Sequence, residues 1–192
     1  RYNGPGNDTD AANAIAVDSN GNVLITGFSH ANPTNSDYLT IKYSGAGVPL
    51  WTNRYNGPGN GLDEVHAITV DTNGNIFVTG LSCASSNFYD YATIAYSGAG
   101  VPLWTNRADG PKDNTFLQGA TVAVDGRGNV IVAGSSPGIG NAFDYMVTKI
   151  PPLPPSLTIV RTTTNTVVVS WPSAATDFML QQNTNRVSSV NW

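Results

Sequence analysis

Along most of the chain, hydrophobic and polar residues alternate with a period of two, and clusters of Gly, Asn and Pro interrupt the alternation. A period of two is that of a β-strand, whereas an α-helix requires about 3.6. In the middle of the chain, the pattern predicts four short antiparallel strands, at residues 66–70, 75–82, 91–97 and 101–107. We therefore expect an all-β protein.

Two of the links between these strands are tight turns. Asn73-Gly74, between the first and second strands, supplies the positive φ angles that a short hairpin turn needs. The Ser-Gly-Ala-Gly sequence at 97–100 does the same between the third and fourth strands. The other links are longer, and in an antiparallel sheet they emerge at the opposite end. We call the side of the molecule that carries these longer links the loop face.

The whole four-strand pattern is repeated in tandem. Residues 1–53 and 54–106 align without a gap and share 34 identical residues in 53 positions. A third copy, 107–150, takes one extra residue before Asp125. Tandem four-stranded units of about 50 residues are typical of β-propeller blades. The sequence therefore predicts three tandem four-stranded propeller-type blades, which form an incomplete propeller.

The residues that recur at fixed offsets also carry a family resemblance. The pattern AxxVDxNGNxxxTGxS, followed by DYxTIxYSGAGVPLW and RYNGPGN, resembles the bacterial β-propeller repeat called SBBP, which occurs in large secreted and surface proteins. The resemblance covers about residues 1–150. It implies a propeller fold and an extracellular or cell-surface location, and it implies no activity or catalytic residues.

The composition changes after the third copy. The proline-rich run 151–155 predicts a stiff linker of polyproline character. Residues 156–192 are rich in Thr, Val and Ser, and the stretch that ends at Trp171 resembles the opening strands of a fibronectin type III sandwich. A sandwich of that kind needs about 100 residues. We therefore expect 156–192 to be a truncated β-sandwich-like segment.

Composition excludes several classes of protein. The chain has 9 Lys and Arg among 192 residues and a net charge of −4, so no basic stripe is available for nucleic acid. No apolar run approaches the roughly 18 residues of a membrane span. The single cysteine, Cys83, excludes a disulfide scaffold or a multi-cysteine zinc site. We expect it to be a buried or half-buried small residue, and the alternative is a disulfide between two chains. No cofactor is predicted.

Sequence divergence between copies points to the loop face as the place where a ligand would bind. The tight turns are nearly identical in copies one and two, whereas 30–36 differs from 83–89 and 8–13 differs from 61–66. Loops held by a rigid scaffold commonly carry recognition. The ligand-binding candidates are His30, Asp37, Tyr38, Asp63, Glu64, His66, Asp90, Tyr91, Asp144 and Tyr145.

Repeated aspartates have two readings each. The Asp-Tyr pairs could hold a blade together, with Asp as an acceptor of backbone N–H groups, or contact a ligand. The turn aspartates, Asp18, Asp71 and Asp125, could stabilise an Asx-type turn or bind calcium, although each turn offers one carboxylate and no bidentate Glu. Arg1, Arg54 and Arg107 recur too, and pairing with the repeated aspartates is one use for them.

The remaining candidates for chemistry are the histidines and the tryptophans. His30 and His66 lack a Ser, Cys or carboxylate at a catalytic spacing, and they would form a metal site only if their two loops converged. Trp51 and Trp104 alternate with leucines in the fourth strand, where they would pack between blades or stack on a carbohydrate.

Taken together, these features predict a non-enzymatic extracellular repeat module that offers a scaffold or a binding surface to a carbohydrate or protein ligand. The alternative is the propeller portion of a secreted hydrolase or lyase that acts on polysaccharides. A closed propeller needs about 4 to 8 blades. Three blades leave two open edges, so we expect either the rest of a longer chain or a second copy to close the propeller.

Overall fold

The computed structural model describes residues 1–32, 35–85, 88–108, 120–137, 143–152, 158–161 and 167–170. The described residues form β-strands in four antiparallel sheets, which confirms the all-β prediction. The chain divides into two compact units, Arg1–Pro152 and Leu153–Trp192. Within the described part of the chain, no helix is long and apolar enough to cross a membrane.

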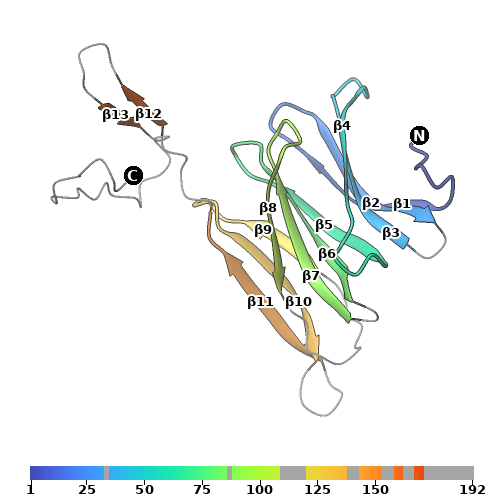
Figure 1. Ribbon diagram of the computed structural model, residues 1–192. Coiled ribbons are helices and arrows are strands. Elements are labelled where there is room, and N and C mark those ends of the chain that lie inside the picture. Colours follow the sequence, from blue (N-terminus) through green and yellow to red (C-terminus); the bar gives the residue numbers. More distant parts are fainter. Residues whose placement is uncertain are drawn as a thin grey trace. The chain divides into compact units, whose positions relative to one another are not determined.

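Two of the sheets are four-stranded meanders with the same layout (Figure 1). Blade 1 consists of β1 (Asp10–Val17), β2 (Val23–Asn32), β3 (Asn35–Tyr43) and β4 (Pro49–Tyr55). Blade 2 consists of β5 (Asp63–Val70), β6 (Ile76–Ser85), β7 (Phe88–Tyr96) and β8 (Pro102–Ala108). The four strands predicted in the second copy are confirmed, although β5 and β7 each begin three residues earlier than predicted, at Asp63 and Phe88.

Blade 3 has three strands among the described residues: β9 (Thr121–Val124), β10 (Val130–Pro137) and β11 (Phe143–Ile150). Four strands were predicted for this copy, and the described residues contain the first three of them but not the fourth. The reason lies in the residues after Ile150, where Pro151 and Pro152 replace the Ser-Gly-Ala-Gly turn of the other blades. Proline has no N–H to donate to a strand ladder, so it opposes continuation of the sheet.

The second unit contains one described hairpin, β12 (Thr158–Arg161) paired with β13 (Val167–Ser170). Alternation of hydrophobic and polar residues predicts strands at 156–161, 166–171 and 178–183, and β12 and β13 match the first two. The third, at 178–183, lies outside the described residues. The fibronectin-like resemblance of 156–192 stays a prediction.

The first strand of blades 1 and 2 carries a β-bulge opposite a glycine. The bulges lie between Ala12 and Ala14 in β1 and at the equivalent place in β5. Gly80 stands opposite the bulge in β5, where a Cβ would overlap the carbonyl oxygen of Glu64 and come within 2.6 Å of the Cα of Val65. The recurrence of glycine here thus follows from the close approach of two strands.

The hydrophobic core lies between blades. Strand β5 contacts β1, β2 and β3, and β9 contacts β5 and β6. In Figure 1 the three sheets accordingly lie side by side. The core between blades 1 and 2 consists of Leu24, Tyr38, Val65, Ile76, Val78, Ala92, Ile94 and Tyr96. The core between blades 2 and 3 is built around Phe77, Ala95, Val130 and Val132.

We call the face of a blade that packs on the following blade its front face, and the opposite one its rear face.

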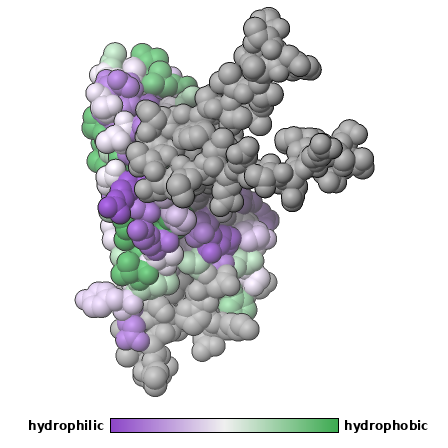
Figure 2. Space-filling view, turned by 90° about the vertical axis from the view of Figure 1, so that its left-hand side faces the viewer, coloured by the Kyte–Doolittle hydropathy of each residue, from purple (hydrophilic) through white to green (hydrophobic). Residues whose placement is uncertain are grey.

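Seen from the side of β11, the described surface mixes hydrophobic and hydrophilic residues (Figure 2). This mixture fits a chain in which 11% of the residues are charged and uncharged polar residues supply much of the surface.

Candidate functional site

An arginine at the end of the fourth strand holds the polar residues of each complete blade together. In blade 1, Arg54 donates to Asp37 Oδ2 from Nε at 3.2 Å and from Nη2 at 2.9 Å. The same guanidinium donates to Ser29, to Oγ at 2.7 Å and to the carbonyl oxygen at 2.9 Å. We call this arrangement the Arg-Asp staple. It ties β2, β3 and β4 to one another through side chains.

The staple recurs in blade 2 with one addition. Arg107 donates to Asp90 Oδ2 at 3.1 and 2.9 Å and to Ser82 Oγ at 2.8 Å. Its Nη1 also donates to the hydroxyl of Tyr55, at 2.8 Å, and so reaches back to blade 1. Asp37 and Asp90 therefore accept from guanidinium groups, which the sequence raised as one use of the repeated arginines.

A second carboxylate lies behind the staple of blade 2. Asp63 is fully buried, and its oxygens accept from the backbone N–H groups of Gly57 at 2.7 Å and Cys83 at 3.0 Å. Burial raises the pKa of Asp63, and the hydrogen bonds from Ser82, Gly57 and Cys83 oppose that rise. A Cβ on Gly57 would overlap Ser82 Oγ and approach Asp63 Oδ1 to 2.6 Å, so the loop can fold onto this carboxylate only with glycine.

In blade 1 the equivalent carboxylate is less completely bonded. Asp10 accepts from the N–H of Gly4 at 2.7 Å. Its Oδ1 is buried without a hydrogen-bond partner among the described residues, as are the Oδ1 atoms of Asp37 and Asn35. The described residues contain no group of three or more His, Cys, Asp or Glu that could hold a metal ion.

The tyrosines of the first two Asp-Tyr pairs lie between blades. Tyr38 donates from its hydroxyl to the carbonyl of Ala92 at 3.2 Å, and Tyr91 donates to the carbonyl of Ser135 at 2.9 Å. Both tyrosines are buried, so they are not available to a ligand on the loop face. In the third pair, Asp144 and Tyr145 are exposed.

The turn aspartates act as Asx-type acceptors. Asp18 accepts from the N–H groups of Asn20 and Asn22 and from Asn22 Nδ2, all at 2.9 Å, and forms an ion pair with Lys42 at 2.9 Å. Burial alone would raise the pKa of Asp18, but these donors together lower it well below its usual range. Asp71 and Asp125 accept the same three bonds from their own turns. Because N–H donors engage both oxygens of each carboxylate, these contacts support the Asx-type turn as the role of the three aspartates.

The two histidines contact different parts of the chain. His30 lies edge to face with Phe28, at 5.6 Å between ring centroids, and its Nδ1 is 3.3 Å from the carbonyl oxygen of Asn32. His66 is the extra residue of the β5 bulge, and its Nδ1 accepts from the N–H of Ala120 at 3.3 Å, next to blade 3. Glu64, two residues before it, is half-buried.

We expect stability to fall in acid through His66. Burial lowers the pKa of this imidazole and Glu64 partly opposes the shift. The folded state therefore binds a proton less readily than the unfolded state, so stability is complete above about pH 6.5 and declines as the pH falls through that value. Only a neutral ring can accept from Ala120. Urea midpoints at pH 7.5 and 5.0 should differ less in His66→Asn than in the parent, whereas His30→Asn should keep the parental difference. Equal differences in all three proteins would contradict this role.

Cys83, Trp51 and Trp104 are structural. Cys83 is a buried free thiol, as predicted. Trp51 packs against Tyr96, with ring centroids 6.1 Å apart, and donates from Nε1 to the carbonyl of Gly98 at 3.2 Å. Trp104 packs against Phe77 at 5.9 Å. These contacts support packing between blades as the role of the tryptophans.

Sequence reasoning left the partner of the repeated aspartates open and overlooked Asp10. Both could have been found from recurrence, because Asp10 and Asp63 are 53 positions apart, as are Arg54 and Arg107. What the sequence did not supply was register, which decides which side chains share one side of a sheet.

Comparison with known proteins agrees with the repeat assignment. The model of the SBBP beta-propeller repeat matches residues 1–33 and 50–89. These segments belong to the two copies that form the four-stranded blades, so the chain is an all-β module in which these two segments match the beta-propeller repeat. No curated protein matches the chain.

Two solved structures resemble the chain. One is a protein of unknown function from Bacteroides caccae, with 12% identity and a TM-score of 0.44, and the match covers 82% of this chain and 52% of that one. The other is a protein of unknown function from Dyadobacter fermentans, with 13% identity and a TM-score of 0.42, covering 82% of this chain and 55% of that one. The matched region thus spans about half the length of each.

Proposed function

We propose that this chain is a non-enzymatic extracellular or cell-surface repeat module whose loop face binds a carbohydrate or protein ligand. The observation that carries the proposal is a pair of contacts that join the start of β3 in blade 1 to the loop before blade 2. Ser36 and Leu62 form a parallel bridge, and Asn35 Nδ2 donates to Asn60 Oδ1 at 3.3 Å. The loop before blade 2 is thereby held against the start of β3, so the two diverging segments share one surface.

The use of the ionisable residues supports a binding role over catalysis. Asp37 and Asp90 are paired with arginines, Asp63 is buried under backbone donors, and His66 accepts from the backbone. A hydrolase or lyase would need an acid and a base that reach the substrate. Near the diverging loops, the large apolar side chains of Leu62 and Phe88 are exposed, which suits stacking or packing against a ligand.

A glycan microarray probed with the full chain tests the proposal. Leu62→Ser and Phe88→Ser should each weaken binding to the glycans that the parent retains by about tenfold, which corresponds to about 1.4 kcal/mol. Leu50→Ser is the matched control, because Leu50 is also an exposed large apolar residue. It lies at the start of β4, next to the tight turn at the opposite end of blade 1. Loss of binding in the control alone would contradict the loop face as the site. Release of reducing sugar from a polysaccharide, abolished by His66→Ala, would establish the enzymatic alternative.

A further inference from the structure

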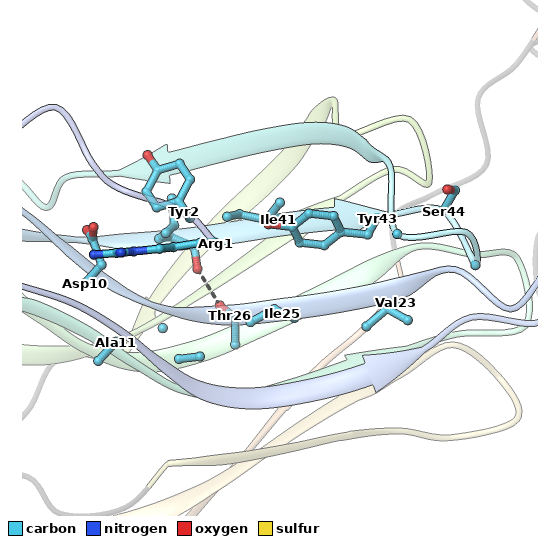
Figure 3. Close-up of a pocket in the computed structure, with 15 residues that line it drawn as sticks. Arg1, Tyr2, Asp10, Ala11, Val23, Ile25, Thr26, Ile41, Tyr43 and Ser44 are labelled. Carbon is cyan, nitrogen blue, oxygen red and sulfur yellow. Dashed lines mark hydrogen bonds between the residues drawn. The ribbon is translucent and has the colours of Figure 1, made fainter.

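The rear face of blade 1 contains an open groove. The groove has a volume of about 510 Å³ and is lined largely by apolar side chains of β1, β2 and β3. Figure 3 shows Arg1 and Tyr2 at one end, near Asp10, and Tyr43 and Ser44 at the other. Among the described residues that line the groove, only Arg1 and Tyr2 come from outside the strands and turns of blade 1.

The residues that line the groove in blade 1 correspond to residues of blade 2 that are buried in the interface with blade 1. Its apolar lining is Ala12, Val23, Ile25, Leu39, Ile41 and Tyr43. The residues 53 positions later are Val65, Ile76, Val78, Ala92, Ile94 and Tyr96, which form the rear face of blade 2 and are buried against blade 1. The side chains that fill that interface come from the front of blade 1 and include Leu24, Tyr38, Trp51 and Tyr55. The groove therefore has the chemistry of a socket for the front face of another blade of this repeat.

Exposure along the same face supports this reading. Ile15 and Val17 in β1 are 67% and 61% exposed. Their equivalents in blade 2, Ile68 and Val70, pack against the core between blades. Two aliphatic side chains that are packed in one copy are thus open to solvent in the other.

Blade 3 presents the complementary front face. Tyr145 is 99% exposed, whereas its equivalents Tyr38 and Tyr91 are 0% and 1% exposed and donate to the following blade. Lys149 is the equivalent of Lys42, whose Nζ donates to the carbonyl of Gly98 in the following blade at 3.0 Å. The matching carbonyl on the rear of blade 1 belongs to Gly45, which lines the groove.

The rear end of blade 1 and the front end of blade 3 each carry one residue of an Arg-Asp staple. Arg1 is the equivalent of Arg54 and Arg107, and Asp144 is the equivalent of Asp37 and Asp90. In register, Ser136 stands opposite Asp144, as Ser29 stands opposite Asp37. Among the described residues, neither Arg1 nor Asp144 forms an ion pair. The chain thus carries a cation at its rear end and a matching carboxylate at its front end.

We propose that the front face of blade 3 binds the rear face of blade 1 of a second copy of this chain, head to tail, with Arg1 of one copy completing an Arg-Asp staple on Asp144 of the other. Arg54 and Tyr55 pair with Leu39 and Tyr38 in blade 1. Arg1 and Tyr2 should pair in the same way with Met146 and Tyr145 of the second copy. They would supply the end of a fourth strand to β11, which is an edge strand among the described residues.

Continuity with the existing interfaces favours a second copy over an unrelated partner. Apart from the residues of the fourth strand, the two exposed faces carry the equivalents of residues that meet in interfaces already present in the chain. Two copies would also bring together six sheets, twice the three in Arg1–Pro152. That number lies within the range of about 4 to 8 blades that closed propellers use.

Sedimentation velocity of the full chain tests the proposal. We expect a concentration-dependent dimer in the parent and at least a tenfold weaker association in Ile15→Asp and in Tyr145→Asp, both exposed positions. Leu50→Asp should associate like the parent, because Leu50 is exposed and its equivalent in blade 2, Leu103, is exposed too and is not part of the core between blades 1 and 2. An equimolar mixture of Ile15→Asp and Tyr145→Asp should recover association, because one intact front face then meets one intact rear face. A parent that stays monomeric, or a dimer indifferent to both substitutions, would overturn the proposal.

A charge exchange tests the staple itself. Arg1→Asp and Asp144→Arg should each weaken the dimer, and the double variant should restore it, with circular dichroism unchanged in all three. Failure of the double variant to associate better than either single variant would remove Arg1 and Asp144 from the interface.

Discussion

Gly80→Ala is expected to lower the free energy of unfolding by about 3 kcal/mol or more, the upper range for overpacking a rigid site. The added methyl group would overlap the carbonyl oxygen of Glu64 and lie 2.6 Å from the Cα of Val65. Both are backbone atoms of the β5 bulge, which cannot move aside as a flexible side chain would. Urea denaturation followed by circular dichroism measures the change.

Gly126→Ala is the control for that substitution. A Cβ at Gly126 meets no atom within 4 Å, so the change should stay within about 0.5 kcal/mol. A stability of Gly80→Ala within about 1 kcal/mol of the parent would show that β5 and β6 do not approach as closely as described.

The second large effect is expected from Arg107→Met, which keeps the length of the side chain and removes the guanidinium. Asp90, a largely buried carboxylate, would lose the ion pair with the guanidinium, and Ser82 and the Tyr55 hydroxyl would lose a donor. Removing one member of a buried pair costs about 3 kcal/mol or more, and the partial exposure of this pair places the expected loss near 3.

Arg54→Met should cost about 1 kcal/mol less than Arg107→Met, because the hydrogen bonds of Arg54 go to Asp37 and Ser29 of its own blade, whereas Arg107 also bonds the Tyr55 hydroxyl, and a hydrogen bond contributes about that amount. Arg127→Met, in an exposed turn, is the matched control and should change stability by less than about 0.5 kcal/mol. Equal effects at Arg107 and Arg127 would contradict the staple.

Local features of the sequence were sufficient to predict the strands of blades 1 and 2. Alternation marks which residues lie in a strand, and Asn-Gly at 73–74 marks where the chain reverses; Gly74 indeed has φ of 82°. Both signals act over a few residues, so one sequence contains them fully. The duplication then carried the same assignment to blade 1.

The placement of Tyr38 and Tyr91 could not be predicted in the same way. We expected the third strand of blade 2 to begin at 91, which puts Asp90 in a loop and Tyr91 beside it on the loop face. The strand begins at Phe88, so both residues lie within β7 and their side chains point to opposite sides of the sheet. Tyr91 therefore enters the interface with blade 3. Alternation of hydrophobic and polar residues did not show that the strand begins three residues earlier, at Phe88. That difference decides whether Tyr91 is exposed on the loop face or buried between blades.

The staple depends on register, which no local pattern specifies. Asp90 and Arg107 are 17 residues apart, on adjacent strands, and meet because Ala92 pairs with Arg107. Recurrence of both residues in each copy was the available signal. Recurrence showed that both residues are repeated, but it did not show that they form an ion pair with each other.

The central claim is that the recurring charged residues hold the blades together. A double-mutant cycle with Arg107→Met and Asp90→Asn, measured as free energies of unfolding in urea, tests it most directly. The 2.9 Å ion pair predicts a coupling of about 2 kcal/mol, so that the double variant loses much less stability than the sum of the single variants. Additive losses, with a coupling below about 0.3 kcal/mol, would contradict the claim.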